Sequence, residues 1–212
     1  MEISTPEIFT LFPSVVCKFI IQEDISDLNK IKNYDWRVVS NDYNYSKTLK
    51  TQVTENLYVL EDFPKEKNII QEYFNYFKNN ILRYENVNCL MTTSWGTKTI
   101  PNAFSHTHNH DNSFYSGVLY LDDYDSGIIF NSYNLSPIQI SAGLPTESNL
   151  YNSKAWSFLP QKNMIMFFPS YLYHSIDVNQ SSKTRYSIAF NFFPDGKFGV
   201  GDSTLNISHL PN

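Results

Sequence analysis

The second half of this 212-residue chain is a series of short apolar segments separated by turn residues. After Cys89, such segments recur at intervals of about ten residues, with Gly, Pro, Asn and Asp between them. This spacing is typical of a β-sandwich, a barrel or a jelly roll. The expected strands are 89–95, 103–107, 114–121, 127–130, 156–159, 164–168 and 185–193.

The first 88 residues mix strand and helix patterns. Pro13 predicts a turn, the apolar run at 15–21 predicts a strand, and residues 23–31 predict a short helix. From Pro64 to Tyr84, apolar residues recur at three- and four-residue steps, which predicts an amphipathic helix packed on a sheet. We therefore expect one mainly β domain over 1–212. Strands and helices at 1–88 would support a β core at 89–200.

Composition limits the function classes. Aromatic residues make up 16% of the chain, which favours β-rich architecture. The net charge of −5 argues against a dedicated nucleic-acid binder. No apolar run approaches the roughly 18 residues of a membrane span, and the N-terminus lacks the positive region of a signal peptide. Cys17 and Cys89 both sit in apolar runs, which predicts buried reduced thiols and a cytoplasmic protein.

Three of the five histidines, His106, His108 and His110, alternate within one short segment. Side chains two residues apart in a strand project from the same face, so two or three of these imidazoles could meet on Fe, Zn, Ni or Cu. A hydrogen-bonded cluster at a polar strand end is the alternative. His174 follows the strand that ends at Pro169, and a single histidine there is more often structural than a ligand.

Arg185 and Ser187 share one face of an apolar strand that follows His174. A guanidinium in such a strand needs a buried anion, either a protein carboxylate or a ligand carboxylate. A 2-oxoglutarate (2OG) oxygenase requires this order of residues: an early histidine pair, a late histidine and then Arg-x-Ser. The histidines would hold Fe(II), while Arg185 and Ser187 would bind the distal carboxylate of 2OG.

Residues 108–120, HNHDNSFYSGVLY, resemble the HxH…SGVxY signature of a family of 2OG-Fe(II) oxygenases found in marine bacteria and tailed phages. Further matches follow in the family's order: 11–16, 94–95, 127–130, 168–170, 174–175, 185–187 and 190–191. The resemblance implies a double-stranded β-helix (a jelly-roll, cupin-like fold) with helices on its outside. It also implies iron on His108, His110 and His174.

The chain departs from the wider superfamily, which combines His-x-Asp or His-x-Glu with a distal histidine. Neither motif occurs here. His106 is the alternative first ligand, or a residue that hydrogen-bonds to a ligand without binding the metal itself. Asp111 directly follows His110 and would face the opposite side of a strand. An all-histidine set removes one negative charge from the iron site.

Three further residues are candidates for contact with the cosubstrate or substrate. Tyr120 and Asn131 could point into the barrel, with strand packing and a turn as their respective alternatives. Asn191 has the same strand parity as Arg185 and Ser187, so it is expected to face the site.

The sequence thus predicts an Fe(II)- and 2OG-dependent dioxygenase, an oxidoreductase that uses O₂ to hydroxylate a C–H bond. Two alternatives are a 2OG-independent, cupin-like enzyme with three histidine ligands and a non-catalytic metal-binding β-barrel. The substrate is expected to be a small molecule or a protein side chain, and a homodimer is left open. The location is expected to be the cytoplasm, that of the host cell if the chain is viral.

Overall fold

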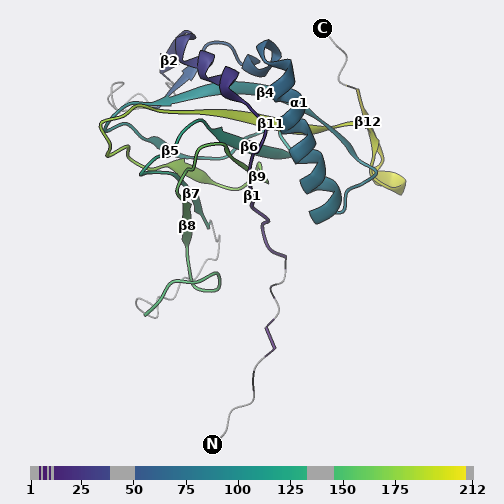
Figure 1. Ribbon diagram of the computed structural model, residues 1–212. Helices are drawn as coiled ribbons and strands as arrows, with labels where there is room; N and C mark the ends of the chain where they lie inside the picture. The colour runs from purple at the N-terminus through teal and green to yellow at the C-terminus, as the bar shows by residue number, and fades with distance from the viewer. Residues whose placement is uncertain are drawn as a thin grey trace, which may run out of the picture.

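The computed structural model describes residues 12–38, 51–132 and 146–208, together with positions 5, 7, 8 and 10. These residues form a mainly β structure with few helices (Figure 1). The strands are β1 Cys17–Ile20, β2 Trp36–Val38, β3 Gln52–Thr54, β4 Asn88–Thr99, β5 Ser105–His108, β6 Tyr115–Tyr120, β7 Ile128–Asn131, β8 Ala155–Phe158, β9 Met164–Pro169, β10 His174–Ile176, β11 Arg185–Phe198 and β12 Leu205–Ile207. The helices are η1 Ser26–Asn33, η3 Val59–Asp62, α1 Pro64–Tyr76, the π-helical η4 Phe77–Ile81 and η5 Gly201–Ser203.

The strands form two antiparallel sheets. The large sheet has the order β1-β9-β6-β11-β4-β3-β2, with β12 paired to β11, and the small sheet has the order β5-β10-β7-β8. In the series β1-β9-β6-β11-β4 and β5-β10-β7, neighbouring strands are not consecutive in sequence, as in a jelly roll. This arrangement is the predicted double-stranded β-helix, and the fold class is confirmed.

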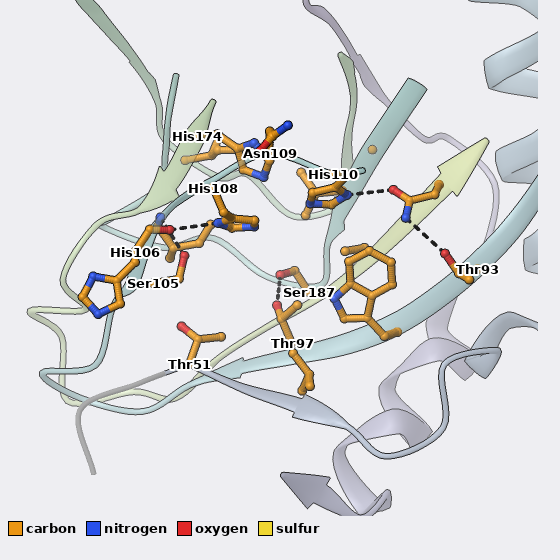
Figure 2. Close-up of a pocket in the computed structure, with 18 of the residues that line it drawn as sticks. Thr51, Thr93, Thr97, Ser105, His106, His108, Asn109, His110, His174 and Ser187 are labelled. Atoms are coloured by element: carbon orange, nitrogen blue, oxygen red, sulfur yellow. Dashed lines mark hydrogen bonds between the residues drawn. The ribbon is translucent and has the colours of Figure 1, made fainter. Parts of the chain in front are cut away.

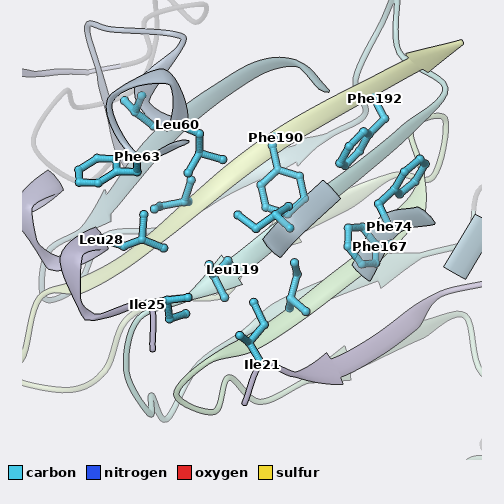
Figure 3. Close-up of a cluster of buried hydrophobic side chains, with 14 of the residues drawn as sticks. Ile21, Ile25, Leu28, Leu60, Phe63, Phe74, Leu119, Phe167, Phe190 and Phe192 are labelled. Carbon is cyan, nitrogen blue, oxygen red and sulfur yellow. The ribbon is translucent and has the colours of Figure 1, made fainter. Parts of the chain in front are cut away.

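The outer face of the large sheet carries the main apolar core, against which α1 packs (Figures 1 and 3). Along β11, Ile188, Phe190 and Phe192 point to this side, as alternation in a strand requires. The ring of Phe74 on α1 stacks on that of Phe192, with centroids 3.8 Å apart. The aromatic stripe predicted for this helix is therefore core.

A second apolar core lies between the two sheets. Val118, Tyr120 and Phe168 of the large sheet meet Ile128 and Phe130 of the small sheet there. Because side chains alternate along each strand, the positions of β6, β9 and β11 that do not belong to the main core face this inner space. The inner face therefore leaves room for polar groups, which gather at one end of the sandwich.

All seven strands predicted after Cys89 are present, as are the strand after Pro13 and the short helix before residue 34. The sequence reasoning missed β2, β3, β10 and β12, which have three residues each and are too short to display a period. The main helix was predicted to reach Tyr84, but it ends earlier. The chain passes through η4 and then turns at Arg83, whose φ of 61° lies in the left-handed region.

Both cysteines are free thiols, with Cys89 buried and Cys17 half-buried. In the described ranges, no helix is both long and apolar enough to cross a lipid bilayer.

Candidate metal centre

His108, His110 and His174 lie together at one end of the small sheet (Figure 2). Their candidate ligand nitrogens all lie within 4.8 Å of one another. His108 is the last residue of β5 and pairs in register with His174, the first residue of β10. His110 follows β5, and its main-chain N–H donates to the carbonyl of Ser170 at 2.9 Å, which holds this segment beside β9.

Each of the three imidazoles is oriented through its Nδ1 atom. His108 Nδ1 is 2.8 Å from the carbonyl oxygen of His106, and His174 Nδ1 is 3.0 Å from that of Leu172. His110 Nδ1 is 2.7 Å from Oδ1 of Asn191. A carbonyl oxygen only accepts, so Nδ1 carries the proton and Nε2 keeps its lone pair. Three such Nε2 atoms form a donor set for a metal ion.

Burial keeps two of these rings uncharged. Desolvation, together with the nearby His108, lowers the pKa of His174 to about 3. Desolvation also lowers the pKa of His110, although its hydrogen bond to Asn191 opposes the shift. Neutral imidazole is the form that binds divalent metals, and it avoids repulsion between cations in contact.

The cluster opens into a cavity of about 640 Å³ between the two sheets. Strand β4 lines one side of this cavity through Thr93, Trp95 and Thr97. The indole of Trp95 lies against His110, with ring centroids 5.5 Å apart. The cavity is large enough for a small ligand beside the metal.

His106 and Asp111 both line the cavity, but neither belongs to the cluster. The ring of His106 points away from the other three (Figure 2) and meets the ring of Phe104 edge-on, with centroids 5.0 Å apart. Asp111 is exposed. Within the described residues, the cluster therefore contains no carboxylate.

Arg185 is 2% exposed, and it forms no ion pair with any residue that the structure describes. Its Nη1 donates to the carbonyl oxygen and, at 3.0 Å, to the hydroxyl of Ser126. Its Nη2 is buried and has no hydrogen-bond partner there. Burial lowers the pKa of Arg185, yet a guanidinium remains charged at neutral pH. The internal salt bridge that the sequence left open is absent from the described residues.

Tyr120 and Ser187 lie with Arg185 on the inner face; Ser187 lines the cavity, whereas Arg185 and Tyr120 do not. Ser187 pairs in register with Tyr120 on one side and with Thr97 on the other. The hydroxyls of Ser187 and Thr97 are 2.6 Å apart, and both residues line the cavity. The Tyr120 hydroxyl is buried without a hydrogen-bond partner in the described chain. Burial raises its pKa, so the hydroxyl stays protonated and can donate.

The two predicted asparagines are placed differently. Asn191 lines the cavity, and its amide contacts His110. Asn131 does not line it, and its Nδ2 donates to the carbonyl of Ile129 at 3.4 Å. Sequence reasoning missed Thr93, Ser116 and Ser170 around Asn191, and Thr97 beside Ser187. Serines and threonines in apolar strands carry no spacing that would mark them.

Residues 93–191 match a family model described as "Putative 2OG-Fe(II) oxygenase". This range contains the three clustered histidines together with Arg185 and Ser187. No curated protein matches the sequence.

Solved structures of similar fold include HygX from Streptomyces hygroscopicus with nickel, 2-oxoglutarate and hygromycin B bound. It is 10% identical, with a TM-score of 0.57, over 85% of this chain and 83% of that one. The α-ketoglutarate-dependent carbocyclase SnoK of nogalamycin biosynthesis is 7% identical, with a TM-score of 0.59, over 92% of this chain and 82% of that one. A 2OG-Fe(II) oxygenase family protein from Burkholderia pseudomallei is 10% identical, with a TM-score of 0.51, over 79% and 76%. The chain thus has the fold of the 2-oxoglutarate-dependent oxygenases, and its histidine cluster and buried arginine lie in the part that matches the family model.

Proposed function

We propose that the protein is an Fe(II)- and 2-oxoglutarate-dependent oxygenase whose iron is held by His108, His110 and His174. The observation that carries this proposal is the convergence of three imidazoles, each with Nδ1 hydrogen-bonded to an oxygen and Nε2 left available. Imidazole is a suitable ligand for Fe(II), and three protein ligands leave positions for cosubstrate and O₂. The donor set therefore fits the metal.

The cosubstrate fits the inner face of β11. Nη2 of Arg185 and the hydroxyl of Tyr120 are buried donors without partners in the described chain, and a bound carboxylate would satisfy both. Ser187 lies in register with Tyr120 and would add a third hydroxyl contact. The residues that line the cavity include the apolar side chains of Val118, Ile128, Phe168, Ile176 and Ala189. These side chains suit the methylene carbons of 2-oxoglutarate.

The residues of the chain have separate tasks in this proposal. The histidines fix the metal, and Arg185 with Tyr120 and Ser187 orients the cosubstrate so that its keto acid end faces the metal. The apolar side chains that line the cavity exclude water from the reacting groups. Iron with 2-oxoglutarate supplies the O₂-dependent oxidative chemistry, while the protein provides binding and orientation.

The reaction that we propose is hydroxylation of a C–H bond. The structural neighbours include proteins described as an α-ketoglutarate-dependent carbocyclase and epimerase, so proteins of this fold also carry out other reactions. The substrate of the present protein would enter the cavity beside Trp95 and Thr93, and a small molecule or a protein side chain would fit its size. The free thiols support a location in the reducing cytoplasm.

The test is cosubstrate binding and turnover in the purified protein. Anaerobic addition of Fe(II) and 2-oxoglutarate should produce a visible charge-transfer band, and admission of O₂ should convert 2-oxoglutarate to succinate. Arg185→Leu should lose the band at the same 2-oxoglutarate concentration, and His174→Ala should lose metal uptake.

A protein that binds iron but gives neither a band nor succinate would overturn the proposal. That result would favour the 2OG-independent, three-histidine type of enzyme, which the absence of a carboxylate from the described cluster also suits. A protein that takes up no iron would instead favour a non-catalytic β-barrel.

A further inference from the structure

The side-chain amide of Asn191 lies against His110 and is held by its neighbours on both sides. His110 Nδ1 is 2.7 Å from Oδ1 of Asn191, and the hydroxyl of Ser116 donates to the same oxygen at 2.7 Å. Nδ2 of Asn191 donates to the hydroxyl of Thr93 at 3.1 Å. The hydroxyl of Ser170, 2.8 Å from that of Ser116, completes the network.

The two ends of this amide have opposite effects on His110. With Oδ1 toward the ring, Nδ1 carries the proton and Nε2 has a lone pair for a metal. With Nδ2 toward the ring, Nδ1 must accept, the proton moves to Nε2, and His110 cannot bind a metal. The hydroxyls of Thr93 and Ser116 can donate or accept, so they tolerate both arrangements. The Ser116 hydroxyl is also 3.1 Å from Nδ1, but the shorter contact, at 2.7 Å, is with Asn191, so the group at position 191 has the larger effect on the tautomer.

We propose that Asn191 is a positioning residue that holds His110 in its metal-binding tautomer and sets how strongly His110 binds the metal. This inference rests on the proposed iron site. A stronger acceptor for the Nδ1 proton makes Nε2 a better electron donor, so metal affinity should follow acceptor strength at position 191. Because the described cluster contains no carboxylate, this hydrogen bond is a route by which the chain can increase the electron density on a ligand nitrogen.

Two substitutions of similar size separate acceptor strength from packing. In Asn191→Asp, a carboxylate replaces the amide and can only accept, which fixes the metal-binding tautomer. In Asn191→Leu, the amide acceptor is lost, and the Ser116 hydroxyl, 3.1 Å from Nδ1, is left as the weaker acceptor beside the ring. We expect the dissociation constant for Co(II) to rise by about 10- to 100-fold in the Leu variant and to stay equal to or fall below the wild-type value in the Asp variant.

The measurement is Co(II) titration of the full chain in competition with a chromophoric chelator, with the Co(II) absorption bands recorded at saturation. The matched control is Thr92→Val. The Thr92 hydroxyl donates to the main-chain carbonyl of Asn191 at 3.4 Å and does not contact His110. This variant should bind Co(II) as the wild type does. Thermal unfolding without metal verifies that each variant is folded.

Equal affinities and bands in the wild type, Asp and Leu variants would overturn the role of Asn191 while leaving the iron site intact. An Asp variant that binds as weakly as the Leu variant would also overturn it, because position 191 would then act through packing. If the Leu variant does not fold, the Asp variant decides: its Co(II) bands must shift from those of the wild type, and unchanged bands and affinity overturn the role. A wild-type protein that takes up no Co(II) would overturn the iron site itself, and this inference with it.

Discussion

Tyr120 lies directly opposite Ser187 in the pairing of β6 with β11, and its buried hydroxyl has no hydrogen-bond partner within the described residues. A buried hydroxyl without a partner costs about 1–3 kcal/mol. Tyr120→Phe should therefore raise the free energy of unfolding of the ligand-free protein by about 1 kcal/mol. The same change should weaken 2-oxoglutarate binding about 10-fold, because a donor to its carboxylate is lost. Chemical denaturation and calorimetric titration measure the two effects.

Tyr124 provides the control for this substitution. Its hydroxyl donates to the carbonyl of Tyr186 at 3.3 Å and accepts from the main-chain N–H of the same residue at 2.9 Å. Tyr124→Phe should therefore destabilise the protein. If Tyr120→Phe also destabilises it, or leaves 2-oxoglutarate binding unchanged, the assignment of this hydroxyl to the cosubstrate is wrong.

Arg185 should govern 2-oxoglutarate affinity without affecting metal affinity. Removing one partner of a buried charge pair costs about 3 kcal/mol, so Arg185→Leu should weaken 2-oxoglutarate binding about 100-fold. Arg185→Lys should not restore it, because an ammonium lacks the planar fork of a guanidinium. Calorimetric titration of the Ni(II)-loaded protein measures these affinities.

A 2-oxo acid without a distal carboxylate tests which end of the cosubstrate Arg185 binds. 2-Oxopentanoate keeps the five carbons and the keto acid group, so its affinity should be similar in the wild type and in Arg185→Leu. Equal losses for both ligands would mean that Arg185 acts on the cavity as a whole rather than on the distal carboxylate.

The histidine cluster should tolerate the loss of His106 but not of its members. His174→Ala and His108→Ala should each abolish stoichiometric uptake of Fe(II) or Co(II), because two imidazoles remain. His106→Ala should retain uptake, since the ring of His106 points away from the cluster and the hydrogen bond to His108 comes from the main-chain carbonyl of His106 (Figure 2). The metal content of each variant after dialysis measures its uptake. Loss of uptake in His106→Ala alone would reassign the first ligand.

The spacing of the histidines could identify the segment of the site but not all of its geometry. Alternation in a regular strand places His106 and His108 on one face. The pairing of β5 with β10, however, shifts register between the pairs His174–His108 and Ile176–Ser105, which adds one residue to β5. This irregularity breaks the alternation, so His108 joins His174 while His106 does not. Nothing in the sequence marks a bulge at this point.

The inner face of β11 could be predicted because its period is regular. Arg185, Ser187 and Asn191 have the same parity, and the structure places all three on the inner side of the large sheet. The partner of Asn191 could not be predicted, because His110 reaches it from beyond the end of β5. Long-range pairs of this kind depend on how the two sheets pack and not on local spacing.

Gly117 should be intolerant of any side chain. A Cβ atom at this position would lie 2.3 Å from the ring of Phe190 and 2.6 Å from the carbonyl oxygen of Met166. Both groups are held in the core, so Gly117→Ala should lower the free energy of unfolding by about 1–3 kcal/mol. Urea denaturation measures the change, with Asn206→Ala on the exposed strand β12 as a neutral control. Equal stability of both variants would mean that β6 can move away from β9 at little cost.

Cys89 should make the protein less stable in alkaline solution. Burial raises the pKa of its thiol from 9.0 to about 11, although the nearby Lys78 opposes the shift. Well below pH 9 the thiol is protonated in both the folded and the unfolded chain, so the free energy of unfolding does not depend on its ionisation. Between pH 9 and about 11 the unfolded chain loses the proton while the folded chain keeps it, so the free energy of unfolding falls as the pH rises. Cys89→Ala should reduce this slope relative to the wild type under reducing conditions. Parallel plots of the free energy of unfolding against pH for the two proteins would show that the thiol ionises as readily in the folded as in the unfolded chain.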